Sequence, residues 1–205
     1  MSGIIGSYHN IRGSVVVNKL GTDGQVFTST GVGGAAGFED AAGGGKMLQA
    51  VQYVATAHTV TSTSTSFADI TNFEIAITPS KASSKILVHF NFHGSSAGSL
   101  VLKIARDIAS AGYADVYDGE AEGVRSRAAT GTGTGGVGGT LNVQDFNAFY
   151  LDSPTYDLTD EITYKAQWLA ESNPTGMCLN RATGSTNFVY VPVTASSITA
   201  IEVGA

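Results

Sequence analysis

The stretch "KILVHFNFHG", residues 85–94, decides the fold class because its apolar side chains recur at every second position. A β-strand turns alternate side chains to opposite faces, whereas a helix would mix the two sets around its axis. One face of the predicted strand then carries Ile86, Val88, Phe90 and Phe92, and the other carries Leu87, His89, Asn91 and His93. We predict that the face with the two phenylalanines is buried in the core.

Runs with the same period lie on both sides of this stretch. The inward residues are predicted to be Phe73, Ile75 and Ile77 in "FEIAITP" (73–79), and Leu100, Leu102 and Ile104 in "SLVLKIARD" (99–107). Further strand candidates are "LQAVQYV" (48–54), "NVQDFNAFYL" (142–151), "ITYKAQWLA" (162–170), "NFVYVPV" (187–193) and "SITAIEV" (197–203). Turn-forming residues separate these runs, and we find no convincing helix longer than two turns. The pattern predicts an all-β fold, a jelly-roll-like β-sandwich rather than a βαβ fold.

In the run at 142–151 the alternation slips around Asp145 and Phe146. Two explanations fit this slip. The strand contains a β-bulge, or it is apolar on both faces because another subunit covers its outer side. We prefer the second explanation.

The composition narrows the classes of partner. The chain has 205 residues, a net charge of −6 at pH 7 and no cluster of Lys or Arg, which argues against binding to nucleic acid or anionic membranes. It contains neither a signal-peptide pattern nor an apolar run near the ~18 residues of a membrane span, so we expect no membrane insertion. The single cysteine, Cys178, excludes an internal disulfide and a cysteine-cluster zinc site, and we predict that it is buried.

Two glycine-rich stretches imitate a dinucleotide-binding loop, "GVGGAA" at 31–36 and "GTGTGGVGG" at 131–139. Such a loop must open a helix whose N-terminal amides hold the phosphates. Three glycines at 43–45 would break a helix after the first stretch, and a predicted strand follows the second. We therefore predict flexible loops, no nucleotide and no other cofactor.

The glycine distribution also divides the chain. Residues 1–47 hold nearly half of its 26 glycines and cannot build a conventional core alone. We place the boundary near Lys46, with an extended glycine-rich N-terminal segment before it and the β-sandwich head at 48–205.

Two constellations resemble metal sites. His89 and His93 are four residues apart, but on a strand they share the face opposite the phenylalanines, so we expect a solvent-facing or interface pair. The acidic stretch "LDSPTYDLTDE", residues 151–161, could hold calcium through Asp152, Asp157, Asp160 and Glu161. Its spacing matches no ordered calcium loop, and ordinary turn formation is the simpler interpretation.

No catalytic constellation emerges. Gly94, Ser96 and Gly98 satisfy the G-x-S-x-G expression, but a nucleophile elbow joins a strand to a helix and this stretch joins two predicted strands. No carboxylate pair can be assigned for glycoside hydrolysis. Trp168 is predicted to lie in the core rather than to stack on a sugar. We predict that the chain is not an enzyme.

Two loops are the first candidates for contact with a partner. "SAGYADVYDGEAEG", residues 110–123, offers the amphipathic side chains of Tyr113 and Tyr117 among carboxylates. "ATGTGTGGVGG", residues 129–139, is too rich in glycine to hold a shape alone. Both loops could instead be connectors without a contact role. Arg125 and Arg127 follow the first loop and are expected to pair with nearby carboxylates, namely Asp115, Asp118, Glu120 or Glu122.

Several of these stretches together resemble a known family. "LGTDGQVFTSTGVGGAAGFED", residues 20–40, resembles the G-T-x-G-Q-V-L-T-S-x-G-x-G element of bacteriophage tail fibres and related virion proteins. Phe27 stands where Leu is usual, and Phe38 stands where an aromatic residue commonly closes the element. The following stretches, from "KMLQAVQ" to "SSITAIEVGA", are similar to a globular domain frequent at the C-terminus of phage fibre proteins.

The resemblance implies a bacteriophage virion structural protein, a short homotrimeric fibre or spike whose head looks like the complement-head and tumour-necrosis-factor jelly roll. Residues 1–18 would attach to other virion proteins, 19–47 would form a glycine-rich trimeric neck, and 48–205 would contact a host cell-surface glycan or protein. The alternative is a capsid-decorating or head-fibre protein without a receptor. Only some 18 residues precede the element, which leaves the attachment site on the tail or the capsid open. The family supplies no catalytic or receptor-binding residues.

Overall fold

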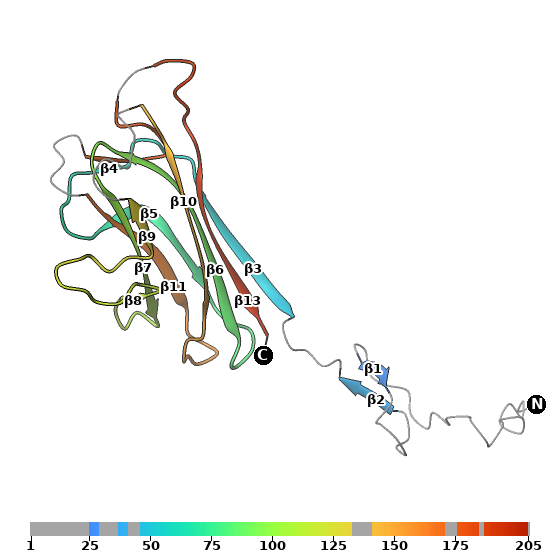
Figure 1. Ribbon diagram of the computed structural model, residues 1–205. Coiled ribbons are helices and arrows are strands. Elements are labelled where there is room, and N and C mark those ends of the chain that lie inside the picture. Colours follow the sequence, from blue (N-terminus) through green and yellow to red (C-terminus); the bar gives the residue numbers. More distant parts are fainter. Residues whose placement is uncertain are drawn as a thin grey trace, which may run out of the picture. The chain divides into compact units, whose positions relative to one another are not determined.

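The computed structural model describes residues 25–28, 37–40, 46–132, 141–170, 176–184 and 187–204. The chain divides into two compact units, Met1–Gly44 and Gly45–Ala205. Within the described residues every regular element is a β-strand and no helix is present (Figure 1). The predicted all-β class is confirmed.

The first unit contains one described hairpin within the predicted neck. Strands β1 (Gln25–Thr28) and β2 (Gly37–Asp40) pair antiparallel, with Phe27 opposite Phe38. A two-stranded hairpin by itself is marginally stable in water. The predicted attachment segment, residues 1–18, lies outside the described residues.

The second unit contains two antiparallel sheets. In the first sheet, the long strands lie in the order β3 (Met47–Ala55), β13 (Ser196–Val203), β6 (Lys85–Ser96) and β10 (Gln144–Asp152). The last residues of β6, at 94–96, pair with β12 (Met177–Leu179) on the side opposite β10, and β12 pairs with β4 (Thr61–Ser62). Figure 1 shows the four long strands running side by side.

The second sheet has the order β5 (Ala68–Ile77), β11 (Ile162–Leu169) and β7 (Leu100–Ile108). Two short strands, β8 (Ala114–Val116) and β9 (Thr130–Thr132), pair with different parts of β7 at its free side.

The strand order identifies the architecture. When β3, β5, β6, β7, β9, β10, β11 and β13 are numbered one to eight, the first sheet reads 1-8-3-6 and the second reads 2-7-4-5. Consecutive strands therefore cross repeatedly from one sheet to the other, which is compatible with a jelly roll of two Greek keys. The predicted β-sandwich is confirmed at this level.

The core lies between the two sheets. The four inward residues of the opening stretch are at most 4 % exposed, and the predicted inward residues of β5 and β7 are also buried. Phe73 meets the rings of Phe90 and Phe92 edge-on, with centroids 6.3 and 6.1 Å apart. Trp168 packs against Phe92 at 6.0 Å, and Cys178 is buried, so both are core residues as predicted. Burial of such side chains stabilises a fold by about 1.5–3 kcal/mol each.

The strand predicted at 187–193 is wrong. This run forms turns, closed by a hydrogen bond from the Val191 N–H to the Phe188 carbonyl at 3.0 Å. Pro192 has no N–H to offer a neighbouring strand. Phe188 stacks on Tyr190 with both rings exposed, so the apolar alternation reflects local contact rather than sheet pairing.

The bulge considered for 142–151 is also wrong. β10 pairs with β6 in unbroken register from Gln144 to Asp152. Phe146 and Ala148 are buried, whereas Phe149 and Leu151 point outward and are 59 % and 49 % exposed. The strand therefore has apolar residues on both faces.

Two buried carboxylates fasten the sandwich. Asp152 accepts hydrogen bonds from Arg106 on β7 and from Tyr164 on β11, which joins the two sheets. Glu202, which is 0 % exposed, accepts from the backbone N–H groups of Ser80 and Lys81 at 2.9 and 3.0 Å. Each carboxylate is therefore satisfied by groups that come from another strand or loop.

The turn between β7 and β8 has an unusual backbone. Ala109 and Ser110 both have positive φ, 52° and 59°, between Ile108 and Ala111, whose N–H bonds the Ile108 carbonyl at 3.0 Å. Two consecutive positions with positive φ are usually held by Asn or Gly, because a Cβ is crowded in this backbone conformation.

Candidate functional site

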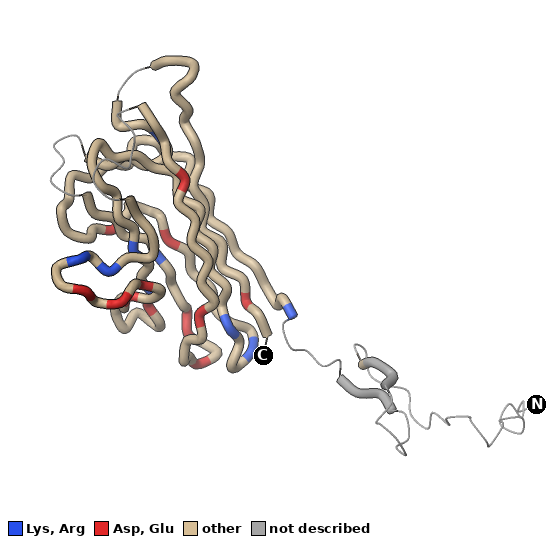
Figure 2. The backbone as a smooth tube through the Cα atoms, viewed as in Figure 1, with Lys and Arg blue, Asp and Glu red and all other residues tan. Residues whose placement is uncertain are grey.

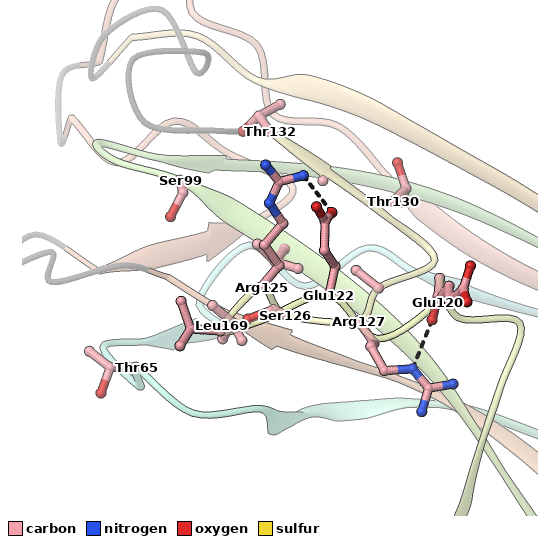
Figure 3. A pocket seen from close by; sticks show the side chains of 15 residues that line it. Thr65, Ser99, Glu120, Glu122, Arg125, Ser126, Arg127, Thr130, Thr132 and Leu169 are labelled. Carbon is pink, nitrogen blue, oxygen red and sulfur yellow. Dashed lines mark hydrogen bonds and ion pairs between the residues drawn. The ribbon is translucent and has the colours of Figure 1, made fainter.

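The head contains a shallow groove of about 1010 Å³ (Figure 3). One wall is the loop between β8 and β9, which contributes most of the residues from Gly119 to Ala128. The floor and far wall come from β7, β9 and the end of β11. Gly131 lets β9 approach β7 closely, since a Cβ there would lie 2.8 Å from the Leu100 carbonyl oxygen.

The groove is lined by hydroxyl and charged side chains together with a few apolar ones. Its hydroxyl side chains come from Thr65, Ser99, Ser126, Thr130 and Thr132. Arg125 bonds Glu122 at 2.8 Å, and Arg127 bonds Asp118 at 2.9 Å and the Gly119 carbonyl at 2.7 Å. The predicted short-range pairing of these arginines is confirmed for Glu122 and Asp118. The Arg125–Glu122 pair is exposed and contributes about 0–1 kcal/mol, so a ligand can displace it at low cost.

The two predicted contact tyrosines lie outside this groove, although the same loop contributes Glu120 and Glu122 to it. Tyr113 is 41 % exposed, and its ring lies over Lys165 with the Nζ 3.4 Å from the ring centroid. Burial and the nearby charge of Glu74 raise the pKa of Tyr113 to about 12. This ring is held against the outer face of the β5–β11–β7 sheet.

Tyr117 is held by a different neighbour. It has a φ of 52°, is 44 % exposed, and stacks on Tyr150 with centroids 5.2 Å apart. Each tyrosine thus presents only part of its ring to solvent. The structure brings neither of them to the other or to the groove.

The second predicted contact loop is described only at its start. Thr130, Gly131 and Thr132 form β9 and line the groove, whereas residues 133–140 lie outside the described residues.

The structure gives His89 and His93 separate partners. The His89 ring stacks on Phe149 at 3.9 Å and its Nε2 lies 3.1 Å from the Asn147 side-chain oxygen. The His93 Nδ1 lies 2.7 Å from the Ala195 carbonyl oxygen. A carbonyl oxygen only accepts hydrogen bonds, so the donor in this contact is an N–H at Nδ1. The two rings lie on the face opposite the phenylalanines, as predicted.

The acidic stretch 151–161 does not converge on one point. Asp152 is buried beside Arg106, and Asp160 accepts from the Asp157 N–H at 2.8 Å within a tight turn. Among the described residues, no group of three or more His, Cys, Asp or Glu side chains could hold a metal ion.

Ser96, the central residue of the G-x-S-x-G stretch, is buried at the end of β6. The chain then turns directly into β7, so this stretch joins two strands.

The two outer faces of the sandwich differ in chemistry. We call the outward residues of β3, β13, β6 and β10 the neutral face. Its register aligns Ala50, Ile201, Leu87 and Leu151 in one row across the four strands, and Gln52, Thr199, His89 and Phe149 in the next.

The outer face of β5, β11 and β7 is charged. Lys103 bonds Asp115 and Lys165 bonds Asp69, both at 2.7 Å, and Glu74 and Asp107 lie on the same face. Hydrogen bonds from Lys165 and Gln167 lower the pKa of Asp69, although burial opposes them. Figure 2 shows charged residues gathered on β7, β8 and the following loop and sparse on the long strands of the first sheet.

The described residues contain no helix with the length and hydropathy needed to cross a membrane. No protein-family model matches this chain, and a comparison with curated proteins finds no match.

Proposed function

We propose that this chain is a bacteriophage virion structural protein, a short homotrimeric fibre or spike that is tail-associated and takes part in adhesion to the host. The observation that carries the proposal is the neutral face, where the side chains of Phe149 and Leu151 are about half exposed in the single chain. An apolar row across a sheet face is typical of a surface that a partner covers, and this supports an oligomer.

The glycine-rich N-terminal segment supports the same proposal. The β1–β2 hairpin is too small to be stable by itself, and identical hairpins from three chains supply the missing contacts. In this arrangement residues 1–18 attach to other virion proteins, 19–47 form the neck and 48–205 form the head.

Adhesion in such a fibre is multivalent. Three weak sites on one head raise the effective concentration of each for a surface that displays many copies of its ligand. The hydroxyl-lined groove and the loop with Tyr113 and Tyr117 are the contact regions that this proposal uses.

One observation favours a second function, a capsid-decorating or head-fibre protein without a receptor. Arg125 and Arg127 are both paired within their own loop. Tyr113 lies against Lys165, and Tyr117 stacks on Tyr150 of β10, so few side chains stand ready for a ligand.

Two experiments test these proposals. Light scattering of the purified chain should give a mass of about 63 kDa, three times 21.0 kDa, at micromolar concentration. A single 21.0 kDa species would contradict the trimer. Electron microscopy of particles then separates a tail position, expected for the adhesin, from a capsid position, expected for the decorating protein.

A further inference from the structure

A second hollow, of about 360 Å³, lies at one end of the first sheet, and we call it the end pocket. Its lining comes from His58 and Thr59, which follow β3, and from residues of the segment that joins β12 to β13. At this end β3 finishes and β13 begins, whereas β3 starts at Met47, at the opposite end of the sheet. Ligand pockets typically enclose about 300–1,000 Å³, so this one has room for a single small group such as one sugar ring.

Arg181 supplies the positive charge of the end pocket. Its Nε donates to the His58 carbonyl at 2.7 Å, and its Nη1 donates to the Ala182 carbonyl at 3.1 Å. A guanidinium has five N–H donors, so these two hydrogen bonds fix its position and leave donors for a ligand.

The charge of Arg181 is not balanced in the way the other arginines are. Among the described residues, every other arginine bonds a carboxylate, namely Arg106, Arg125 and Arg127. The reason lies in the sequence, which has no Asp or Glu at 47–68 or at 172–201, the two stretches that contain the lining residues. Asp145 lies 3.7 Å from the His93 Nε2 and is not part of the lining.

Both walls of the end pocket are fixed by one buried side chain. The amide of Asn180, which is 0 % exposed, donates to the carbonyls of Ala55 and Ala57 at 2.7 and 3.0 Å and so holds the chain before His58. The Asn180 carbonyl accepts from the Thr194 N–H at 2.9 Å, which closes the second segment. A site that is already in place costs a ligand less ordering on binding.

The rest of the lining matches the two kinds of surface on a sugar ring. Polar side chains can exchange hydrogen bonds with hydroxyl groups, and these are His58, Thr59 and Asn187. Apolar side chains can contact ring carbons, and these are Val191, Pro192 and Val193. The rings of Phe188 and Tyr190 stack on each other and are not part of the lining.

One arginine suits an anion of one charge. A carboxylate is planar, carries one negative charge and can accept two parallel hydrogen bonds from a guanidinium. A phosphate monoester carries about −1.5 to −2 at pH 7, which a single arginine does not balance. The whole chain carries −6 and does not attract anions in general, so the attraction must be local to Arg181.

We propose that the end pocket binds a sugar that bears a carboxylate, with Arg181 holding the carboxylate and Thr59 and Asn187 bonding the hydroxyls. This inference adds a ligand and a place for it to the proposed function. It depends on the pocket alone and not on the oligomer.

The test titrates the full chain with sugars that differ only at carbon 6, followed by ligand-observed NMR. The acids are glucuronic and galacturonic acid, and each is compared with its neutral parent, glucose or galactose, and with the 6-phosphate of that parent. At least one acid should bind about tenfold or more tightly than its neutral parent and more tightly than its 6-phosphate, because its carboxylate gains charge-assisted hydrogen bonds.

Two variants assign this preference to the end pocket. Arg181→Gln should weaken binding of the acid about tenfold or more and leave the weak binding of the neutral sugar unchanged. Val193→Asp keeps Arg181 and its backbone hydrogen bonds, and it places a carboxylate at a lining position that is 62 % exposed. It should exclude the acid in the same way, because the new carboxylate repels the ligand and competes for the guanidinium.

Arg125→Gln is the matched control, since it removes an arginine that lines the groove beside β9. Binding of the acid should be as in the parent. Circular dichroism verifies that all three variants are folded.

The remaining outcomes overturn the inference. If neither acid binds, or each binds no more tightly than its neutral parent, the pocket is not a carboxylate site. Tighter binding of a 6-phosphate would assign the charge of Arg181 to phosphate, and a loss confined to Arg125→Gln would place the site in the groove. The mass of the parent by light scattering is a separate measurement, so the proposed oligomer can fail while this inference stands, and the reverse.

Discussion

The Nη1 of Arg106 lies 2.7 and 2.6 Å from the two carboxylate oxygens of Asp152, so that one guanidinium nitrogen holds both. Arg106 belongs to the second sheet and Asp152 ends β10 in the first. The Tyr164 hydroxyl donates to the same carboxylate at 2.7 Å, and burial together with this negative charge raises the pKa of Tyr164. The pair therefore fastens the two layers at one end of the sandwich.

Asp152→Asn should lower the free energy of unfolding by about 3 kcal/mol, because it leaves the largely buried Arg106 without its counter-charge. Urea unfolding followed by tryptophan fluorescence measures this loss. Glu122→Gln removes the partner of Arg125 from a fully solvated pair and should cost less than about 1 kcal/mol. Equal losses from the two substitutions would mean that the sheets are not fastened by this bridge.

Phe90→Asp should abolish the folded head. Phe90 is 4 % exposed and packs against Phe73, and an unpaired carboxylate at this depth costs several kcal/mol, out of a typical stability of about 5–15 kcal/mol.

The matched change is His89→Asp, one residue along on the outer face. The His89→Asp chain should still unfold cooperatively. If the neutral face is a subunit contact, this change should weaken only the association of the chains. Circular dichroism reports the fold and light scattering reports the mass. Loss of the fold in both variants would overturn the assignment of faces.

Stability at acid pH should depend on Glu202. Burial alone would raise the pKa of this carboxyl, but the Ser80 N–H and further hydrogen bonds outweigh burial and lower it from its ordinary 4.5. Because the folded pKa lies below the unfolded one, the stabilisation is complete above the unfolded value and is lost as the pH falls through the folded value.

Glu202→Gln should therefore cost about 2 kcal/mol at pH 7 and flatten the decline in stability below about pH 4.5. Urea midpoints measured between neutral pH and about pH 3 check this slope. Glu161→Gln, at an exposed position, should leave the slope as in the parent. If the stability of the Glu202→Gln variant fell with pH as steeply as that of the parent, the assignment of this decline to Glu202 would be contradicted.

The Tyr113→Ala and Tyr117→Ala double variant should remain assembled while particles that carry it adsorb more weakly to host cells. Each ring is partly exposed, and the cation–π contact of Tyr113 with Lys165 is worth only about 0.5–1 kcal/mol at such a site. Tyr190→Ala removes an exposed ring on another loop and serves as the control. Adsorption equal to that of the parent would place the binding surface elsewhere or exclude this chain as the adhesin.

Local periodicity predicted the core well and the surface poorly. The alternation of Ile86, Val88, Phe90 and Phe92 identified a buried face because burial in a sheet depends on every second residue. The same rule failed at 187–193, where the stacked pair Phe188 and Tyr190 imitates a strand. The inward position of Glu202 could have been read from Ile198 and Ala200, which share its face.

The groove and the neutral face could not be predicted in this way. The groove combines Thr65, Ser99 and Leu169 with the loop after β8, and such distant segments meet only through the fold. The apolar row depends on the register of four strands, and a shift of one residue in any strand would remove that strand from it. Tyr113 and Tyr117 were predicted from residue type alone, which does not reveal the neighbours on which their rings rest.

The turn at Ala109 and Ser110 has a practical consequence. Its left-handed backbone is not one that its residues favour, since neither is Gly or Asn, and it connects the paired strands β7 and β8. The loop could thus be opened to carry a foreign peptide without removing a favourable local conformation. Because it lies at one end of the charged face, away from the row that we assign to subunit packing, an epitope inserted there would be displayed outward on every copy.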